Sequence, residues 1–306
     1  MPSPILLLAS VVFVLWLALS LARTRQFPSE RFLTPAPGRG AGDDEAAGAA
    51  ADGASVAAIV PARNEADVLA AALASLLAQD HRRFSVYLVD DGSTDGSAEV
   101  ARTTGTGAEL PLWVESAGDK PPGWAGKVFA QSRGLAAIEA AGAAPDWLLL
   151  TDADIRHPPD SVSRLLAQAE RGGYDLVSVM ARLHAVSFFE RLLIPTFVFF
   201  FHLLYPFREV SRRGSSTAAA AGGCVLVRTR VLRAAGGFEA LRDALIDDVA
   251  LGRLVKGSGG HLWLGFDPDI ESIRPYDGLG DIWRMVARSA FVQLRFSYLA
   301  VAGVVL

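Results

Sequence analysis

Two features of this 306-residue sequence predict an α/β fold, built on a mostly parallel, Rossmann-like sheet with helices on both faces. Short runs rich in β-branched residues alternate with longer segments in which Ala and Leu recur at helical spacing. Polar residues cluster after three of the strand-like runs, and ligands of such folds bind beyond the carboxyl ends of the strands. A separate apolar segment near the amino terminus predicts attachment to a membrane.

The alternating pattern runs from Ser55 to Val179, at the spacing of consecutive strand–helix–strand units. Asn64 precedes the first helical segment and is placed to cap it. The predicted strands are Ser55–Val60, Phe84–Val89, Leu112–Glu115 at an edge, Trp147–Leu150 and Asp175–Val179, and the predicted helices are Ala66–Gln79, Ser97–Thr103, Val128–Ala141 and Pro159–Arg171.

The apolar run Ile5–Ala22 predicts a retained transmembrane helix. It has 18 uncharged residues, and a helix of that length spans roughly 27 Å, close to the thickness of the hydrocarbon core. A cleaved signal peptide is the alternative, but no Lys or Arg precedes the run, whereas Arg23, Arg25 and Arg31 follow it. Since positive charge stays on the cytoplasmic side, the residues after Arg23 are expected to face the cytosol.

Composition divides the chain further. Residues 23–54 are rich in Pro, Gly, Ala and Asp and poor in large apolar residues, which predicts a flexible linker between the anchor (1–22) and an α/β domain (55–285). Residues 286–306 are expected to form an interface helix and the start of a truncated membrane segment.

The net charge of −4 gives no indication of nucleic-acid binding. The hydrophobic content of 51% is high for a soluble enzyme or a soluble binding module.

An aromatic block, Phe188–Phe207, follows the last predicted strand. It contains seven phenylalanines, is interrupted by Pro195 and carries Arg191 and His202. Such a segment is typical of a helix that lies in the membrane interface rather than one that crosses the bilayer. A buried core helix is the alternative, because the length of the run does not separate the two.

Two carboxylates follow the buried strand-like run Trp147–Leu150. Asp152 and Asp154 are one residue apart, and two ionised side chains so close repel each other unless a cation lies between them. Hard divalent ions bind carboxylate and phosphate oxygens, so the pair predicts a Mg²⁺ or Mn²⁺ site for a nucleotide diphosphate. The alternative is that Asp154 only caps the turn before Pro158.

The first two strands also end in polar clusters. Asp90 and Asp91 can accept a hydrogen bond from a base N–H or a ribose hydroxyl, while Gly92 permits a close approach. A plain strand-to-helix turn is the alternative. The first strand ends in Val60–Glu65, which includes Arg63. Three polar strand ends predict one ligand site at this edge of the sheet.

These segments together resemble the GT-A domain of family 2 glycosyltransferases. The resemblance covers about Ser55 to Leu264 and implies an inverting enzyme that uses a nucleotide sugar and a divalent metal. Residues 55–285 would then be the glycosyltransferase domain. The matching motifs are Val60–Glu65, Val89–Asp95, Gly123–Lys127, Asp152-Ala-Asp154, Gly236–Glu239 and Ile246–Gly252, in the order in which the family carries them.

Within the family, the layout is most similar to the hopanoid-associated (hopene-associated) branch. The anchor, Gly123–Lys127, the aromatic block and Asp281–Arg288 carry this likeness. It implies a hexosyltransferase of the bacterial inner (cytoplasmic) membrane, with its catalytic domain on the cytosolic side. The implied acceptor is a membrane lipid, with a hopanoid as the candidate. A polyprenyl phosphate or a polysaccharide is the alternative acceptor.

The resemblance also assigns roles to individual residues. Asp91, with Asp90, would hold the uracil and ribose of a UDP-type donor, and Asp154, supported by Asp152, would bind the metal. Lys127 would pair with a donor phosphate, the alternative being an exposed lysine at a helix start. The general base would be Asp248 or Asp247; the alternative is that they are only acids favoured by the dipole at a helix N-terminus.

The other residues assigned to the donor are Pro61, Arg63, Glu65 and Arg288. Arg288 is the single retained residue of the Gln-X-X-Arg-Trp motif of processive members, which argues against polymer synthesis. It could steady the leaving diphosphate, or belong to an arginine face with Arg284 that reaches toward lipid headgroups.

Two other classes of protein fit the sequence less well. A sugar nucleotidyltransferase would need a glycine-rich phosphate loop after the first strand, and Val60–Arg63 is not one. A non-catalytic membrane scaffold would have no need of the intact carboxylate pairs.

Overall fold

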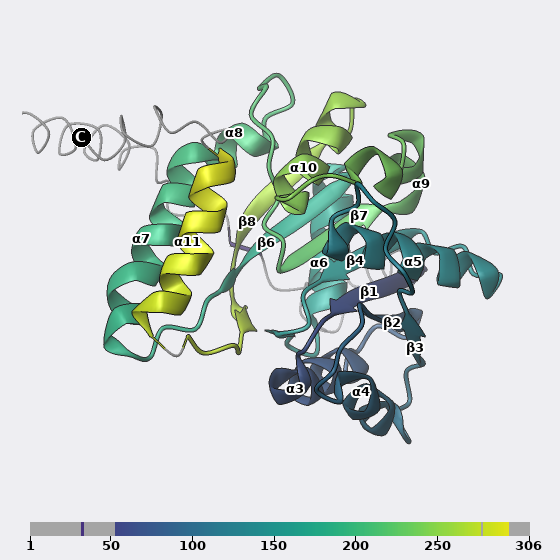
Figure 1. Ribbon diagram of the computed structural model, residues 1–306. Helices are drawn as coiled ribbons and strands as arrows, with labels where there is room; N and C mark the ends of the chain where they lie inside the picture. Colours follow the sequence, from purple (N-terminus) through teal and green to yellow (C-terminus); the bar gives the residue numbers. More distant parts are fainter. Residues whose placement is uncertain (1–31, 34–52, 277, 294–306) are drawn as a thin grey trace, which may run out of the picture.

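The computed structural model describes residues 32–33, 53–276 and 278–293 (Figure 1). The predicted anchor Ile5–Ala22, most of the predicted linker and the final apolar stretch from Tyr298 lie outside the described residues. Among the residues that are described, no helix combines the length and the apolar character needed to cross a bilayer.

The described residues form one eight-stranded sheet in the order β3-β2-β1-β4-β7-β6-β8-β5. Its strands are β1 (Val56–Ala62), β2 (Phe84–Asp90), β3 (Leu112–Ser116), β4 (Trp147–Thr151), β5 (Ile155–Arg156), β6 (Leu176–Arg182), β7 (Cys224–Arg228) and β8 (Leu262–Ser272). The helices are α3 (Ala66–Leu77), α4 (Ser97–Gly105), α5 (Gly126–Ala140), α6 (Ser161–Gly172), α7 (Phe188–Leu204), α8 (Phe207–Ser211), α9 (Thr229–Ala234), α10 (Asp247–Gly257) and α11 (Leu279–Gln293), with a 3₁₀ turn, η1, at Phe238–Leu241.

The sheet is mixed but mostly parallel, as predicted, and it contains antiparallel pairs that the sequence did not indicate. β1 to β4 pair in parallel, and β6 pairs in parallel with β8. The strand β7 lies antiparallel between β4 and β6, and β5 is antiparallel to β8. The run Cys224–Val227 is buried on both faces and therefore lacks the alternation that marks a half-buried strand. The sequence pattern gave no reason to place it between two strands of the predicted sheet.

Helices cover both faces of the sheet, as predicted. One core cluster packs α5, α9 and α10 on one face, through residues such as Val128, Leu232 and Val255. The other packs α3 and α6 on the opposite face, through residues such as Leu73 and Leu165. Because both faces are buried, the polar ends of the strands are the parts of the sheet left to meet a ligand.

Helix α7 contains most of the aromatic block and lies beside α11 at the edge of the fold (Figure 1). Ser187 and Glu190 form a capping box at its start, and only Glu190, Ile194 and His202 of the helix are buried. Phe188 is 73% exposed, and Leu192 and Leu204 are also exposed. The buried-core alternative for this segment is therefore wrong, and the interface helix stays a prediction.

Two residues of the predicted linker touch the domain. Phe32 forms a β-bridge with Phe266 of β8, and Leu33 N donates to Phe266 O at 2.8 Å. Leu33 is buried among the residues of the second core cluster. The chain that enters from the predicted anchor thus contacts β8 before the first strand begins.

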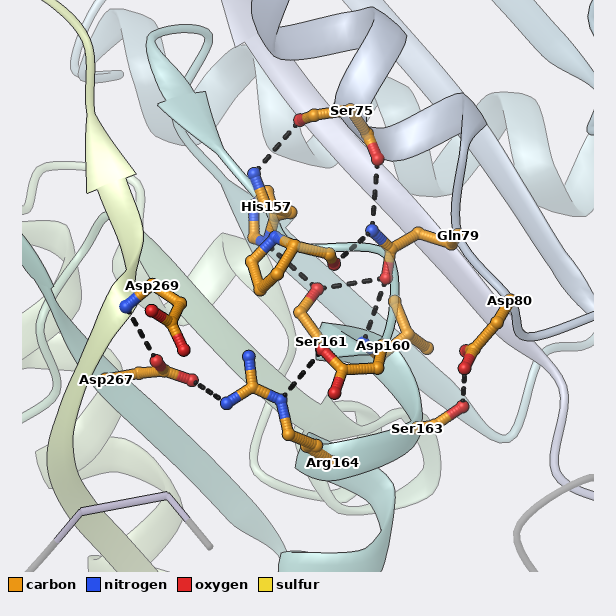
Figure 2. Close-up of polar contacts among 12 residues, drawn as sticks. Ser75, Gln79, Asp80, His157, Asp160, Ser161, Ser163, Arg164, Asp267 and Asp269 are labelled. Atoms are coloured by element: carbon orange, nitrogen blue, oxygen red, sulfur yellow. Dashed lines mark hydrogen bonds and ion pairs between the residues drawn. The ribbon is translucent and has the colours of Figure 1, made fainter. Parts of the chain in front are cut away.

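A buried ion pair joins α6 to β8 (Figure 2). Arg164 Nη1 lies 2.7 Å from Asp267 Oδ2, and the two side chains are 6% and 0% exposed. The half-exposed Asp160 also contacts Arg164, at 3.1 Å from Nε. Burial raises the pKa of Asp267, a rise opposed by the Asp269 N–H and by Arg164. The pair holds β8, which carries residues of the site described below, against the helix layer.

We expect Asp267→Ala to lower the free energy of unfolding by about 3 kcal/mol, because it leaves the Arg164 charge buried without its main partner. Asp160→Ala, the matched control at the same arginine, should cost less than about 1 kcal/mol, since Asp160 is half exposed. Urea unfolding followed by circular dichroism measures both. Equal effects of the two substitutions would contradict this account.

Candidate functional site

The predicted polar strand ends lie at one edge of the sheet. The parallel register pairs Ala62 of β1 with Asp90 of β2, so the segments that follow the two strands are neighbours. Arg63 Nη1 lies 3.3 Å from Asp91 Oδ2 across them. Pro61, also predicted to contact the donor, lies within β1 opposite Val89.

The loop after β2 is held by its own hydrogen bonds. Ser93 N donates to Asp90 at 3.2 Å, and Thr94 N donates to Asn64 Oδ1 at 2.9 Å. Asn64, with φ of 56°, therefore supports this loop and does not cap α3, whose N-cap is Glu65. The Asp91 carboxylate lies against α5, where a Cβ on Gly126 would come within 2.8 Å of Asp91 Oδ2. Asp90 shapes the loop, while Asp91 faces the start of α5.

Lys127 connects the end of β4 to the start of α10. Its Nζ lies 2.6 Å from Asp152 Oδ1 and 3.3 Å from Asp247 Oδ2. Burial alone would lower the pKa of Lys127, but the neighbouring Asp152 and Asp247 raise it above its ordinary value. Lys127 is therefore a fixed cation between two carboxylates and not a lone exposed lysine.

Asp248 is the most perturbed carboxyl group of the site. Its Oδ2 accepts from Gly222 N at 2.8 Å, and its Oδ1 accepts from Val249 N at 2.7 Å. Burial and the adjacent Asp247 raise the pKa of Asp248 to about 7, against the opposing effect of Lys127. A group with a pKa near neutrality is suited to accept a proton at physiological pH.

Gly222 permits this arrangement through its lack of a side chain. A Cβ at this position would lie 3.2 Å from Asp248 Oδ2 and 3.3 Å from Lys127 Nζ. The backbone before β7 thus approaches both the lysine and the carboxylate closely. Nothing in the local sequence around Gly222 indicated this contact.

Asp154 is held by residues that follow in the chain much later. Its Oδ2 accepts from Ser272 Oγ at 2.8 Å and lies 3.4 Å from Arg274 Nε. Burial and the charge of Asp152 raise the pKa of Asp154, and the Ser272 hydrogen bond opposes that rise. The capping role considered for Asp154 is not what the structure shows. Ser272 and Arg274 were missed because no sequence signal connects the end of β8 to the end of β4.

Asp152 and Asp154 are chemically suited to a divalent metal, if the diphosphate of the donor supplies further ligands. Within the described residues, no group of three or more His, Cys, Asp or Glu side chains is arranged to hold a metal. Asp152 and Asp154 supply two hard oxygen donors, and burial and the charge of Asp152 raise the pKa of Asp154, so a cation there would stabilise its ionised form. Diphosphate oxygens would complete the coordination, as is usual for Mg²⁺ bound with phosphates.

Buried polar groups support the turn that carries Asp152 and Asp154. Thr151 Oγ1 donates to Gly223 O at 2.8 Å and lies 2.9 Å from His157 Nε2. His157 N donates to Ser75 Oγ of α3, and the ring lies beside Ser161 of α6 (Figure 2). Burial lowers the pKa of His157 to about 3, so the ring is neutral at physiological pH. Thr151 therefore ties the turn that carries Asp152 and Asp154 to the segment whose Gly222 N–H donates to Asp248.

Arg288, the remaining predicted donor residue, lies in α11, and its side chain is outside what the structure describes. Arg284, one turn earlier, is 75% exposed and pairs with Asp281 of its own helix. The contact of Arg284 is thus within its own helix and not with Asp152 or Asp154. The role predicted for Arg288 stays a prediction.

Comparison with known proteins identifies the family. The sequence model described as "Glycosyl transferase family 2" matches residues 57–236. This is more than half of the chain, so the protein belongs to glycosyl transferase family 2, and the predicted family is confirmed. The hopanoid-associated branch stays a prediction.

Curated relatives include two named undecaprenyl-phosphate 4-deoxy-4-formamido-L-arabinose transferase. The protein from Aeromonas hydrophila subsp. hydrophila is 31% identical over 144 residues, which are 44% of this chain and 40% of the relative. That from Pectobacterium carotovorum subsp. carotovorum is 28% identical over 177 residues, 56% of this chain and 47% of the relative. The chain therefore matches less than half the length of these relatives.

Solved structures share the fold. A mannosyltransferase from Pyrobaculum calidifontis superimposes with a TM-score of 0.61 at 20% identity, over 92% of this chain and 71% of that protein. The predicted α/β fold of the GT-A type is supported in this mixed-sheet form.

Asp248→Asn is expected to raise the thermal midpoint at pH 8 more than at pH 5. The pKa of Asp248 is about 7 in the folded protein and about 4 in an unfolded chain. The folded state therefore retains this proton longer, and ionisation costs stability as the pH rises through 7. An asparagine can still accept a hydrogen bond from Gly222 but carries no charge. Differential scanning fluorimetry of the full chain at both pH values measures the change; a lower midpoint at pH 8 would contradict it.

Proposed function

We propose that this protein is an inverting, metal-dependent glycosyltransferase that moves a sugar from a nucleotide sugar, of the UDP type, to a lipid in the membrane. The observation that carries the proposal is the arrangement of Lys127 between Asp152 and Asp247, with Asp248 buried beside them. This arrangement supports a site in which Asp248 would accept a proton, Lys127 would supply a cation and Asp152 would help to bind a metal.

The donor would lie along the carboxyl ends of β1, β2 and β4. Asp91 would accept hydrogen bonds from the base or ribose, with Asp90 holding its loop. Asp154 and Asp152 would hold the metal, which when bound neutralises charge on the diphosphate. Lys127 would exchange one of its carboxylate partners for a phosphate oxygen. The Pyrobaculum mannosyltransferase, which shares the fold, is described in complex with GDP-mannose and Mn²⁺.

Asp248 would act as the general base. With a pKa of about 7 it is ionised for part of the time near pH 7, and the carboxylate can take the proton of an acceptor hydroxyl as the oxygen attacks the sugar carbon. The bond between that carbon and the diphosphate breaks on the opposite side, which inverts the configuration. Asp247 beside it pairs with Lys127 and keeps the pKa of Asp248 high.

The nature of the base favours an acceptor with a hydroxyl, for which a hopanoid or another lipid alcohol is the candidate. A phosphate acceptor is already ionised and needs no base. The second candidate is a polyprenyl phosphate, which is favoured by the printed names of the relatives as undecaprenyl-phosphate transferases. A hydroxyl acceptor would therefore need Asp248 as a base, whereas a polyprenyl phosphate would not.

The aromatic face of α7, with α11 beside it, is proposed to rest on the bilayer. Phe188, Leu192, Leu204 and Trp283 are exposed there, Trp283 by 69%. Large apolar side chains in contact with water favour burial in a membrane interface. The segment 1–22 would anchor the protein to the inner membrane with the catalytic domain in the cytosol, as the arginines after it predict.

We expect membranes that contain the full chain to transfer labelled sugar from a UDP-sugar to lipid, and Asp154→Asn to abolish this transfer. With a hydroxyl acceptor, the rate should fall below about pH 7, and Asp248→Asn should lower it at least 100-fold. Incubation with a panel of labelled UDP- and GDP-sugars, with a hopanoid alcohol or a polyprenyl phosphate added, measures both after lipid extraction.

The control is Arg233→Met, which removes an exposed ion pair with Glu139 near the carboxyl-terminal end of α5, whereas Lys127 lies at its start. Full activity of Asp248→Asn with polyprenyl phosphate would support the second candidate. Transfer by Asp154→Asn at the wild-type rate would refute the metal-dependent mechanism. Wild-type transfer that a metal chelator leaves unchanged would also refute it.

A further inference from the structure

Arg274 reaches from the end of β8 to carboxylates at the ends of two other strands. Its Nη2 forms an ion pair with Glu65 Oε2, after β1, and its Nε lies 3.4 Å from Asp154 Oδ2, after β4. The side chain is about one-third exposed, at 34%. The guanidinium thus lies between the strand that begins the nucleotide site and the strand that carries the metal ligands.

The segment that carries Arg274 is fixed on both sides. Ile273 N donates to the Asp154 carbonyl at 2.9 Å, and Tyr276 N donates to Glu190 Oε1 at 2.9 Å. Glu190 is itself 1% exposed, and it also accepts from Ser187 N and from the His184 ring, each at 2.7 Å. An arginine held in this way loses little conformational freedom on binding a ligand.

Arg274 is placed to bind an anionic ligand that also binds a metal at Asp154. A guanidinium carries five N–H donors in a planar fork, so it can bind phosphate oxygens while it keeps one carboxylate partner. A metal at Asp154 would compete with Arg274 for that carboxylate, because both are cations. The diphosphate that arrives with the metal offers the arginine new oxygens at the same place.

We infer that Arg274 binds the diphosphate of the nucleotide-sugar donor, a role that the resemblance suggested for Arg288. This inference rests on the proposed function, since it requires a diphosphate next to Asp154. Arg274 keeps its ion pair with Glu65 and turns its remaining N–H groups to the phosphate oxygens. It stabilises the negative charge that develops on the leaving diphosphate when the bond to the sugar breaks.

The test compares UDP with uridine, which lacks the phosphates. Binding of each to the full chain in detergent, with Mn²⁺ present, is measured by isothermal titration calorimetry. Arg274→Met should weaken UDP about 10- to 100-fold, because a charge-assisted contact is lost. Uridine binding should change less than about twofold. Arg274→Lys should lie between the two, since it keeps the charge and loses the fork, and Arg233→Met is the matched arginine control.

Unchanged UDP affinity in Arg274→Met would overturn the inference while leaving the proposed function intact. Equal weakening of UDP and uridine would show a structural role and would also overturn it, as would a loss of affinity for Mn²⁺ alone. If wild-type protein binds UDP with Mn²⁺ no more tightly than uridine, the proposed diphosphate site itself is wrong. Thermal midpoints of all variants show whether each one is folded.

Discussion

The site depends on the ion pairs that Lys127 makes with Asp152 and Asp247. They join the end of β4, which carries the proposed metal ligands, to the start of α10, which carries the proposed base. One lysine faces three carboxylates, because Asp248 lies beside Asp247. Burial, together with the neighbouring carboxylate in each case, raises the pKa of Asp248 and the pKa of Asp154, and Lys127 opposes both rises. A metal ion bound with the diphosphate would add positive charge next to these carboxylates.

The rest of the fold keeps these groups in place. Gly222 lets the backbone approach the lysine and Asp248, and Thr151 ties that segment to the turn of Asp152 and Asp154. The buried pair of Arg164 and Asp267 holds β8 against α6, and β8 in turn delivers Ser272 to Asp154. Such support from groups that touch no ligand is what preorganises a polar site. It also couples the exposed helix α7, through Glu190 and the segment of Arg274, to the donor side.

Much of the site could be predicted from sequence, because its residues follow strands that are recognisable by their apolar runs. Asp91, Asp152, Asp154 and Lys127 come together as expected. What could not be predicted depends on contacts between distant segments. The antiparallel strand β7 has no alternation to reveal it, and Gly222 is ordinary in its local sequence. Arg274 follows a strand that the pattern did not mark, so no motif indicated it, whereas the resemblance offered Arg288 as a residue that could steady the diphosphate.

The most direct test of the central ion pairs is the pH dependence of stability in Lys127→Met. Lys127 lowers the pKa of Asp248, which burial and Asp247 raise. Without the lysine the pKa of Asp248 should rise further, so the folded state holds a proton that is released only as the pH increases. The thermal midpoint of the variant, followed by differential scanning fluorimetry on the full chain, should fall increasingly below that of the wild type between pH 5 and pH 8. A difference that is constant over this range, or the absence of any difference, would contradict the account.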